Sequence, residues 1–299
     1  VDAGETLAIV GESGSGNSMS VLAANGLVPS PPAQLECRAL FGGQDLMAMD
    51  DKERRGVSGR HVGFVFQEPM TSLNPLLTIG RQMTEAARLH LELSASEADG
   101  KAVELLSLVG IPEPEARMKA YPHQLSGGMR QRVVIAMALM CDPEVLIADE
   151  PTTALDVTTQ AQILDLVSRL QERFEMAVVW ITHDLGVVAD FADRVAVMYA
   201  GRIVEEAPTR ELFAAPSHPY TRGLLTARPR LGEPDVELAT IPGVPPDPRR
   251  LPAGCSFYPR CPYRADTRCE TEMPPLREIA PGHRTRTFYD LEPYRGGAS

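Results

Sequence analysis

The sequence has 299 residues, of which 43% are hydrophobic and 23% charged, the balance of a folded globular protein rather than a disordered one. Asp and Glu number 40 against 29 for Lys and Arg, so the formal net charge is −11. Because non-specific binding to nucleic acid or to an anionic membrane surface usually needs a basic face, this charge argues against both.

The sequence also argues against membrane-spanning and secreted proteins. Its longest apolar runs, such as residues 133–141, are about half of the roughly 18 residues that a membrane-spanning helix needs. No charged and then apolar leader is found at the start, and five cysteines are too few for a secreted disulfide framework. We therefore expect a cytosolic protein.

The first part of the chain predicts strands around a glycine-rich loop. Residues 6–10 form a short apolar strand that runs directly into the loop 11–16. Residues 34–41, followed by Gly42 and Gly43, predict a strand that enters a hairpin turn. The β-branched and aromatic run 62–66 predicts a buried strand.

Helical spacing dominates residues 76–140, where apolar side chains recur every three to four positions. Beyond this region, residues 145–148, 177–181 and 195–199 are continuous apolar runs of strand length, separated by helical segments. This alternation predicts a mostly parallel sheet that is covered on both faces. From about residue 229 prolines become dense and the periodicity fades, so we expect an irregular C-terminal extension at 229–299 after a domain at 1–228.

The glycine-rich loop has the context of a phosphate-binding loop, since it follows a strand and opens a helix. Its glycines let successive backbone N–H groups face inward, and the helix N-terminus adds positive potential for phosphate oxygens. Ser18 is placed to bind Mg²⁺ through its hydroxyl. The alternative is a strand-to-helix turn without a ligand. The predicted nucleotide-binding residues here are Gly11, Glu12, Ser13, Gly14, Ser15, Gly16, Asn17, Ser18 and Met19.

Asn17 stands where this motif normally has lysine. Asparagine can donate a neutral hydrogen bond, but it is shorter and carries no charge. A hydrogen bond to a charged group contributes about 1.5–3 kcal/mol, so its loss predicts about ten- to a hundredfold weaker ATP binding. Hydrolysis should fall further, because the lysine also neutralises charge on the transferred phosphoryl group.

A second acidic motif lies at the end of the strand at 145–148, where Asp149 and Glu150 follow the apolar run. A carboxylate there can hold Mg²⁺, and its neighbour can orient or deprotonate an attacking water. Two acids after a strand can equally be a helix N-cap on a solvated surface. Upstream, Ser126, Gly127 and Gly128 offer a second helix N-terminus with exposed N–H groups suited to phosphate.

The order of these motifs resembles the nucleotide-binding subunit of an ATP-binding cassette (ABC) transporter over essentially the whole chain. The ordered motifs are the phosphate loop, Gln67, Leu125-Ser126-Gly127-Gly128 with Gln131, Asp149-Glu150, Ala154-Leu155-Asp156 and His183. The resemblance implies an α/β fold of the P-loop NTPase class and ABC type, with a mostly parallel sheet, an inserted helical subdomain at about 76–140 and an irregular C-terminal extension.

The resemblance also implies roles for individual residues. Ser18, Gln67 and Asp149 would hold Mg²⁺, Glu150 would be the catalytic carboxylate and His183 would contact the γ-phosphate of ATP. Asp156 would lie in a dimer-communication loop. In this family two cassettes pair head to tail, so Leu125, Ser126, Gly127, Gly128 and Gln131 would serve the partner's ATP site, and Asn17 would impair only the chain's own site.

Residues 66–75, 217–221 and 251–262 are similar to the ATP-binding subunits of oligopeptide, dipeptide and nickel importers. Such importers imply a second, different ATP-binding subunit, two membrane permeases and an extracytoplasmic peptide-binding protein, with no nucleic acid partner. The chain would then lie peripherally on the cytoplasmic face of the inner membrane. Cassettes of this kind normally have a further strand region and an adenine-stacking aromatic residue before the loop. Only ten residues precede Gly11 here, so we expect weaker adenine stacking.

Three cysteines, Cys255, Cys261 and Cys269, lie close together in the C-terminal extension. Some members of the family hold an iron–sulfur cluster with four cysteines in this region, but no thiol is found near Thr287, where the fourth is expected. A cubane cluster or a structural zinc ion needs four ligands, and His283 could complete a zinc set. Ordinary reduced thiols are the alternative.

The resulting prediction is a subunit that energises peptide import by ATP-driven dimerisation and hydrolysis. Because of Asn17, a subunit that no longer hydrolyses ATP, or a truncated or decayed paralogue, stays open as the alternative. A soluble ABC ATPase acting on DNA or ribosomes is a third reading. It is disfavoured because such chains carry long coiled-coil insertions or two cassettes in tandem.

Overall fold

The computed structural model describes residues 1–31, 33–67, 72–153, 155–227, 240–264 and 266–294. Within these residues the chain divides into two units, each of which has its own group of strands. The first unit contains residues 1–5 and 21–181, and the second contains residues 6–20 and 182–299, apart from the residues not described.

The first unit is built on three parallel strands in the order β4-β5-β6. They are β4 (Val62–Val65), β5 (Val145–Asp149) and β6 (Ala177–Thr182), and nearly all of their residues are buried. Strands that are buried on both faces read as continuous apolar runs, which is why the sequence predicted all three. At Gly63 an added Cβ would lie 2.6 Å from the carbonyl oxygen of Ala138. The strand β4 therefore packs closely against the C-terminal end of α7 (Gly127–Ala138).

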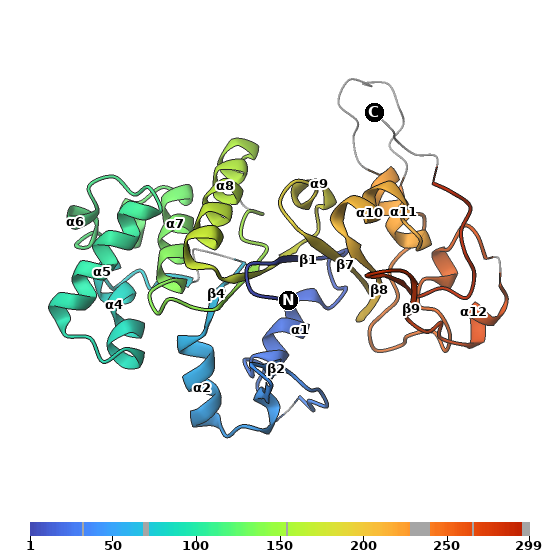
Figure 1. Ribbon diagram of the computed structural model, residues 1–299, viewed down its shortest axis with the longest axis horizontal. Helices are drawn as coiled ribbons and strands as arrows, with labels where there is room; N and C mark the ends of the chain where they lie inside the picture. The colour runs from blue at the N-terminus through green and yellow to red at the C-terminus, as the bar shows by residue number, and fades with distance from the viewer. Residues whose placement is uncertain (32, 68–71, 154, 228–239, 265, 295–299) are drawn as a thin grey trace. The chain divides into compact units, whose positions relative to one another are not determined.

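The helices of this unit begin at recognisable caps. Ser94 and Asp50 form capping boxes with Glu97 and Glu53, and Thr78 accepts the N–H of Arg81. Figure 1 shows α4, α5, α6 and α7 gathered into one helical group, and all four lie within residues 76–140. The helices are α2 (Asp51–Arg60), α4 (Ile79–His90), α5 (Ala95–Leu108), α6 (Pro114–Arg117), α7 (Gly127–Ala138) and α8 (Val157–Phe174), with short 3₁₀ turns at Leu46–Ala48 and Pro122–Gln124. The helix α1 (Asn17–Ala24) begins in the second unit and ends in the first.

The predicted hairpin is shorter than expected. Its strands are β2 (Leu40–Phe41) and β3 (Gln44–Asp45), joined by the turn at Gly42 and Gly43. Residues 34–39 are mostly exposed and form no strand. Without a buried face, their alternating pattern has nothing to pack against.

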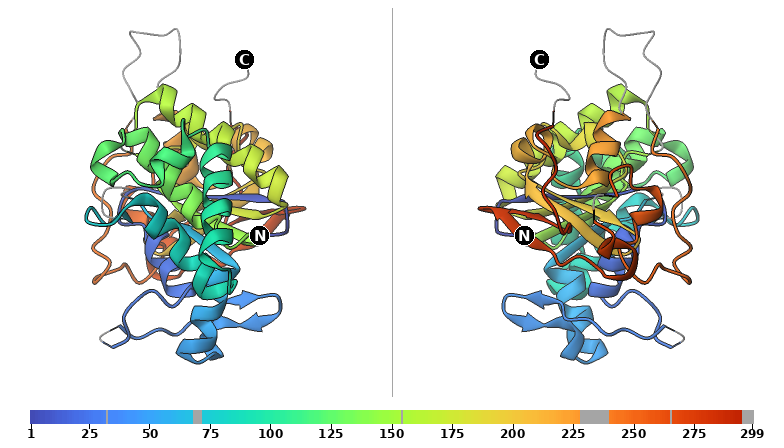
Figure 2. Two further views of the ribbon diagram at one scale, coloured as in Figure 1. Left: turned by 90° about the vertical axis from the view of Figure 1, so that its left-hand side faces the viewer. Right: turned by 90° about the vertical axis from the view of Figure 1, so that its right-hand side faces the viewer.

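The strands of the second unit follow the order β1-β7-β8-β10-β9. The strands β1 (Thr6–Val10) and β7 (Arg194–Tyr199) pair in parallel, whereas β8 (Arg202–Pro208), β10 (His283–Thr285) and β9 (Arg277–Ala280) continue the sheet in antiparallel fashion. The described part of the C-terminal extension contains the β9–β10 hairpin, which the sequence pattern did not predict, and only short helical turns besides. Figure 2 shows this hairpin, in red, beside the yellow β8.

Short helices and an aromatic cluster complete this unit. Tyr199 on β7, Tyr220 on α11 and Phe257 of the extension are fully buried, with ring centroids 4.6 to 5.4 Å apart. Aromatic pairs at these distances add to the stabilisation from buried area, so the cluster fixes part of the extension on β7. The helices are α9 (Leu185–Val188), α10 (Thr209–Ala214), α11 (Pro219–Thr226) and α12 (Arg268–Thr271), with a 3₁₀ turn, η3, at Tyr258–Arg260.

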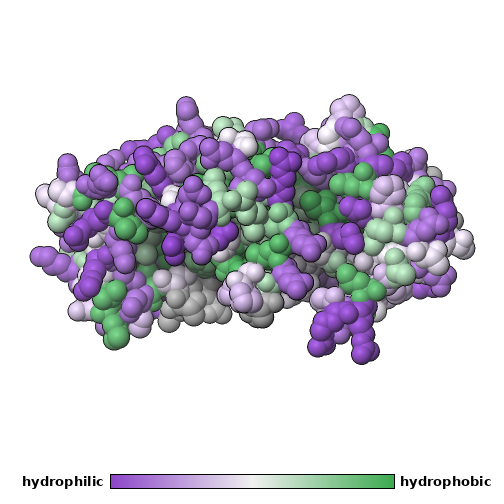
Figure 3. All heavy atoms as spheres, turned by 90° about the horizontal axis from the view of Figure 1, so that it is seen from below, coloured by the Kyte–Doolittle hydropathy of each residue, from purple (hydrophilic) through white to green (hydrophobic). Residues whose placement is uncertain are grey.

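The surface carries a mixture of side chains. On the face drawn in Figure 3, hydrophobic residues are scattered among hydrophilic ones. Among the described residues, no helix combines the length and the apolar character needed to cross a membrane.

Candidate nucleotide-binding site

The glycine-rich loop joins β1 to α1, as the sequence predicted, and it lies in the second unit. Gly14 and Gly16 have φ angles of +83° and +93°, a backbone conformation that other residues adopt only with strain. At Gly11 an added Cβ would lie 2.3 Å from the carbonyl oxygen of Met198, so only glycine lets the loop pass so close to β7. The loop is closed by the Ser15 N–H, which donates to the Glu12 carbonyl at 3.0 Å.

Asn17 is buried at the start of α1, with 8% of its surface exposed. Its Oδ1 has no hydrogen-bond partner among the described residues. A buried polar atom without a partner is costly, and a ligand group that supplied one would relieve that cost. Since the two ends of an asparagine amide are interchangeable by rotation, the side chain can present a donor to phosphate at this place. Ser18 is half-buried and Met19 is exposed in the same first turn.

Two predicted residues of the first unit are in direct contact. The Gln67 Nε2 donates to Glu150 Oε2 at 3.2 Å, although the two residues are 83 positions apart. Sequence reasoning missed a third member, Thr153, whose hydroxyl donates to the same Glu150 oxygen at 2.8 Å. A threonine three residues after a carboxylate is a signal that could have found it, because such side chains commonly hydrogen-bond locally.

The backbone at Glu150 is unusual, with φ at +44°. A left-handed conformation costs a residue with a Cβ about 1–2 kcal/mol, and such strain clusters at functional sites. The Glu150 N–H donates to the Ile181 carbonyl at 3.0 Å, which holds the residue at the end of β5. Its side chain remains half-exposed, so water can reach the carboxylate.

Asp149 is the last residue of β5 and is 5% exposed. Carboxylate, hydroxyl and amide oxygens, as in Asp149, Ser18 and Gln67, are the ligands that Mg²⁺ prefers, so the chemistry of the predicted donor set fits this ion. These residues belong to both units, and His183, which is exposed in the turn after β6, belongs to the second.

The serine–glycine motif lies at the N-terminus of α7, as predicted. Ser126 is the N-cap, its Oγ accepting the Met129 N–H at 3.3 Å, and Gly127 is exposed. Leu125 is buried, and Gly128 packs against α8, since an added Cβ would lie 3.1 Å from the Thr159 methyl. The exposed cap leaves a helix N-terminus available for an anion. Gln131 is fully buried, and neither of its amide atoms has a partner among the described residues.

Asp156 is the N-cap of α8. Its carboxylate accepts the Thr159 hydroxyl at 2.7 Å and the Thr159 N–H at 3.0 Å, and these hydrogen bonds lower its pKa. Residues 68–71 and 154, which belong to predicted motifs, and residues 229–239 of the predicted extension lie outside the described residues.

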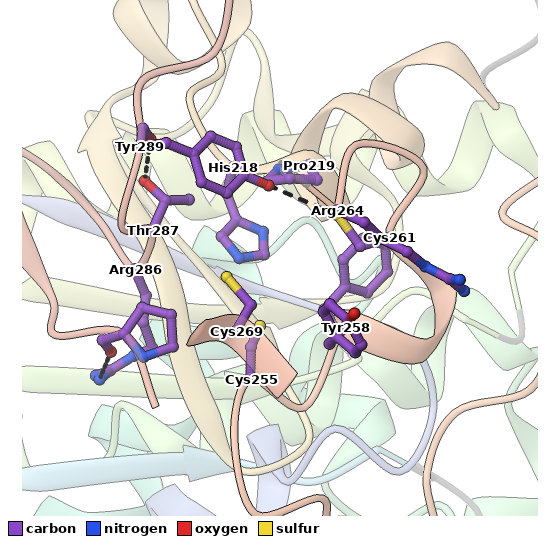
Figure 4. Close-up of a pocket in the computed structure, with 12 residues that line it drawn as sticks. His218, Pro219, Cys255, Tyr258, Cys261, Arg264, Cys269, Arg286, Thr287 and Tyr289 are labelled. Atoms are coloured by element: carbon purple, nitrogen blue, oxygen red, sulfur yellow. Dashed lines mark hydrogen bonds between the residues drawn. The ribbon is translucent and has the colours of Figure 1, made fainter. Parts of the chain in front are cut away.

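The three clustered cysteines surround one small cavity, together with Thr287 and Tyr289 (Figure 4). The Cys261 thiol lies 3.7 Å from the Tyr289 hydroxyl, and the Thr287 hydroxyl donates to the Tyr289 carbonyl at 2.8 Å. Burial raises the pKa of Cys255, and it raises that of Cys269 to about 11, so these thiols are protonated at neutral pH.

This cavity does not fit a four-thiolate cluster. Its volume is about 10 Å³, room for about one water molecule, and Thr287 offers no thiolate. His283 does not complete a zinc set here, because its Nε2 is bound to Glu205 Oε1 at 2.8 Å. In the part of the chain that the structure describes, no three His, Cys, Asp or Glu residues are grouped so that they could hold a metal ion. The predicted metal site at these cysteines gains no support.

Comparison with known proteins identifies the class. A family model described as "ABC transporter" matches residues 1–153, and one described as "Oligopeptide/dipeptide transporter, C-terminal region" matches residues 204–269. The ATP-binding cassette MJ0796, in a post-hydrolysis state bound to ADP and Pi, is 32% identical with a TM-score of 0.62. This match covers 70% of this chain and 88% of that one. The cbiO1 protein of Clostridium perfringens, part of an ABC transporter complex, is 30% identical with a TM-score of 0.62, covering 72% and 81%. The predicted fold class is confirmed.

Within that class, the chain is similar to ATP-binding proteins of peptide transport. The dipeptide transport ATP-binding protein DppD of Escherichia coli is 50% identical over 98% of this chain and 89% of its own. The oligopeptide transport ATP-binding protein OppD of Bacillus subtilis is 51% identical, and the match covers 96% of this chain and 81% of that protein. The chain therefore belongs to the oligopeptide/dipeptide transporter family of ABC transporter ATP-binding subunits.

Proposed function

We propose that this chain is the ATP-binding subunit that energises import of peptides, or of a related small solute, through an ABC transporter. Pairing with a second cassette would be driven by ATP, and hydrolysis would separate the two. The observation that carries the proposal is the hydrogen bond between Gln67 and Glu150, which joins two separate predicted motifs at one place within a chain of this family. The solute class is inferred from the dipeptide and oligopeptide transport proteins that the chain resembles.

We assign the following roles to the residues of the site. The backbone of the loop 11–16 and the start of α1 would hold the phosphates of ATP. Ser18, Gln67 and Asp149 would hold Mg²⁺, which when bound supplies charge stabilisation for the transferred phosphoryl group. Glu150 would take a proton from the attacking water, and Gln67 and Thr153 hold its carboxylate in place. His183 would contact the γ-phosphate.

The assembly would contain a second, different ATP-binding subunit, two membrane permeases and an extracytoplasmic peptide-binding protein. The exposed N-terminus of α7, with Ser126 and Gly127, would complete the ATP site of the other subunit. Asp156 would transmit between the two sites. The chain would bind peripherally at the cytoplasmic face of the inner membrane, through the region around Gln67.

A second candidate is a nucleotide-binding subunit that does not hydrolyse ATP at its own site. The observation that favours it is Asn17, a neutral and buried residue in place of the lysine. The intact Asp149, Glu150 and His183 favour the first candidate.

Phosphate release from Mg-ATP by the purified chain tests the roles proposed for Asn17 and Glu150. We expect Asn17→Lys to raise the rate at least tenfold, because the lysine charge stabilises the transition state. In that background, Glu150→Gln should lower the rate about a hundredfold or more, because it removes the general base. Glu172→Gln, an exposed carboxamide substitution on α8, is the matched control and should leave the rate unchanged. Hydrolysis that persists in Asn17→Lys/Glu150→Gln would contradict the assignment of Glu150.

A further inference from the structure

Glu12 of the phosphate loop is held from two sides by residues that lie far away in the sequence. The Arg260 guanidinium donates to both of its carboxylate oxygens, from Nη1 to Oε2 at 2.8 Å and from Nη2 to Oε1 at 3.2 Å. The Glu12 N–H donates to the Tyr220 hydroxyl at 2.9 Å. Because the Glu12 carbonyl accepts the Ser15 N–H, these contacts fix the turn that closes the loop.

Arg260 is itself rigidly held. Its Nε donates to the Pro242 carbonyl at 3.0 Å, Nη1 donates to the Tyr199 hydroxyl at 3.3 Å, and Nη2 donates to the Ile241 carbonyl at 3.2 Å. Together with the two bonds to Glu12, these contacts use all five N–H donors of the guanidinium. The side chain is only 6% exposed. A guanidinium held in this way cannot turn toward a phosphate, so its effect on a nucleotide must pass through Glu12.

The anchor of this contact is the C-terminal extension. Arg260 ends the 3₁₀ turn η3, directly before Cys261, and η3 follows Phe257 in the aromatic cluster with Tyr199 and Tyr220. The same aromatic cluster therefore supports Tyr220 and Arg260, the two residues that contact Glu12. All of these residues belong to the second unit.

We propose that the C-terminal extension is part of the nucleotide site, with Arg260 as a positioning residue that orders the phosphate loop through Glu12. The proposal rests on the ATP-binding function proposed above. With the neutral Asn17 in place of lysine, binding depends more on backbone N–H groups, and these bind well only when the loop is ordered beforehand. The extension thereby supplies part of the nucleotide affinity without touching the nucleotide.

Two measurements on the full chain test this proposal. Hydrogen exchange of the segment 11–16 without nucleotide reports loop order, and calorimetric titration with Mg-ATP reports affinity, each in the native and Asn17→Lys backgrounds. We expect Arg260→Met and Glu12→Gln to speed exchange and to weaken Mg-ATP binding about tenfold, the range for loss of a charged hydrogen bond. Arg260→Lys should recover part of the affinity, since lysine keeps the charge but not the paired geometry. The double variant should bind no more weakly than either single variant, because both remove the same contact.

Arg249→Met is the matched control, since Arg249 lies in the same extension and pairs with Asp247. It should change neither measurement. Unchanged Mg-ATP affinity in folded Arg260→Met and Glu12→Gln would overturn the proposal, and so would an equal effect of Arg249→Met. Unchanged hydrogen exchange of the segment 11–16 in Arg260→Met would also overturn the positioning role. If the Asn17→Lys chain with an intact Arg260 fails to bind Mg-ATP, it is the proposed function that fails. Should Arg260→Met not fold, Glu12→Gln, on a partly exposed side chain, decides the matter.

Discussion

At the scale of single residues, Glu150 and Asn17 are the most informative, because each is held in an arrangement that costs free energy. Glu150 keeps a left-handed backbone while Gln67 and Thr153 hold its carboxylate. Asn17 is buried at the position where the phosphate loop normally has a charge, and its Oδ1 has no hydrogen-bond partner within the described part of the chain. Both features point to a ligand site rather than to a feature needed for folding, since each lowers the stability of the chain without ligand.

His218 predicts a pH dependence of stability. It is the N-cap of α11, its ring accepting the Tyr220 N–H, and burial, together with the positive charge of Arg286, lowers its pKa to about 3. In the unfolded chain its pKa is about 6.5, so between about pH 6.5 and pH 3 the imidazole is protonated in the unfolded state but neutral in the folded state. Stability is therefore fully present above about pH 6.5 and is lost as the pH falls toward 3, by up to about 1.4 kcal/mol per pH unit.

The variant His218→Asn isolates this effect, because asparagine can still cap the helix but does not titrate. In urea unfolding at several pH values, the free energy of unfolding of the native chain should fall relative to that of His218→Asn as the pH is lowered from 6.5 to 4. A constant difference between the two chains across that range would show that His218 does not titrate on unfolding.

At the scale of elements, the sequence predicted the apolar strands better than it predicted the contacts that fix the C-terminal extension. Continuous apolar runs placed β1, β4, β5, β6 and β7 to within one or two residues, because a strand buried on both faces must be apolar. The strands β8, β9 and β10 carry charged residues such as Glu205, Glu206 and Arg284, which hide the pattern. Their charges are paired in the fold, and no single-sequence pattern shows which residues pair. The contact of Arg260 with Glu12 was missed for the same reason.

Glu205 on β8 links three parts of the second unit. It is fully buried, and its carboxylate accepts the N–H groups of Ser217 and His218 and binds His283 of β10. Glu205→Ala leaves these buried groups without a partner, so we expect it to lower the free energy of unfolding by about 3–5 kcal/mol. Chemical denaturation measures this change. Glu211→Ala, at an exposed position on α10, should change it by no more than about 0.5 kcal/mol. A similar small change for Glu205→Ala would mean that the link does not stabilise the extension.

At the scale of the whole molecule, the family could be predicted from the order of short motifs, and the comparisons confirm it. Of the predicted site residues, Gln67 contacts Glu150 and Ser126 caps α7, while the roles that the motifs imply for them toward a nucleotide stay predictions. The supporting residues, Thr153, Tyr220 and Arg260, were not predicted, because they act through partners that only the folded chain brings together. The three cysteines do converge on one cavity, yet its size and Thr287 do not suit a four-thiolate cluster.

The proposed function requires that this chain binds ATP, and the sequence predicts that Asn17 weakens its own site. The most direct measurement is a calorimetric titration with Mg-ATP of the native chain and of Asn17→Lys. We predict that the lysine variant binds about ten- to a hundredfold more tightly, as expected when a hydrogen bond to a charged group is restored. Equal affinities would contradict the claim that Asn17 impairs the site, and the absence of binding in both chains would contradict the assignment of ATP binding itself.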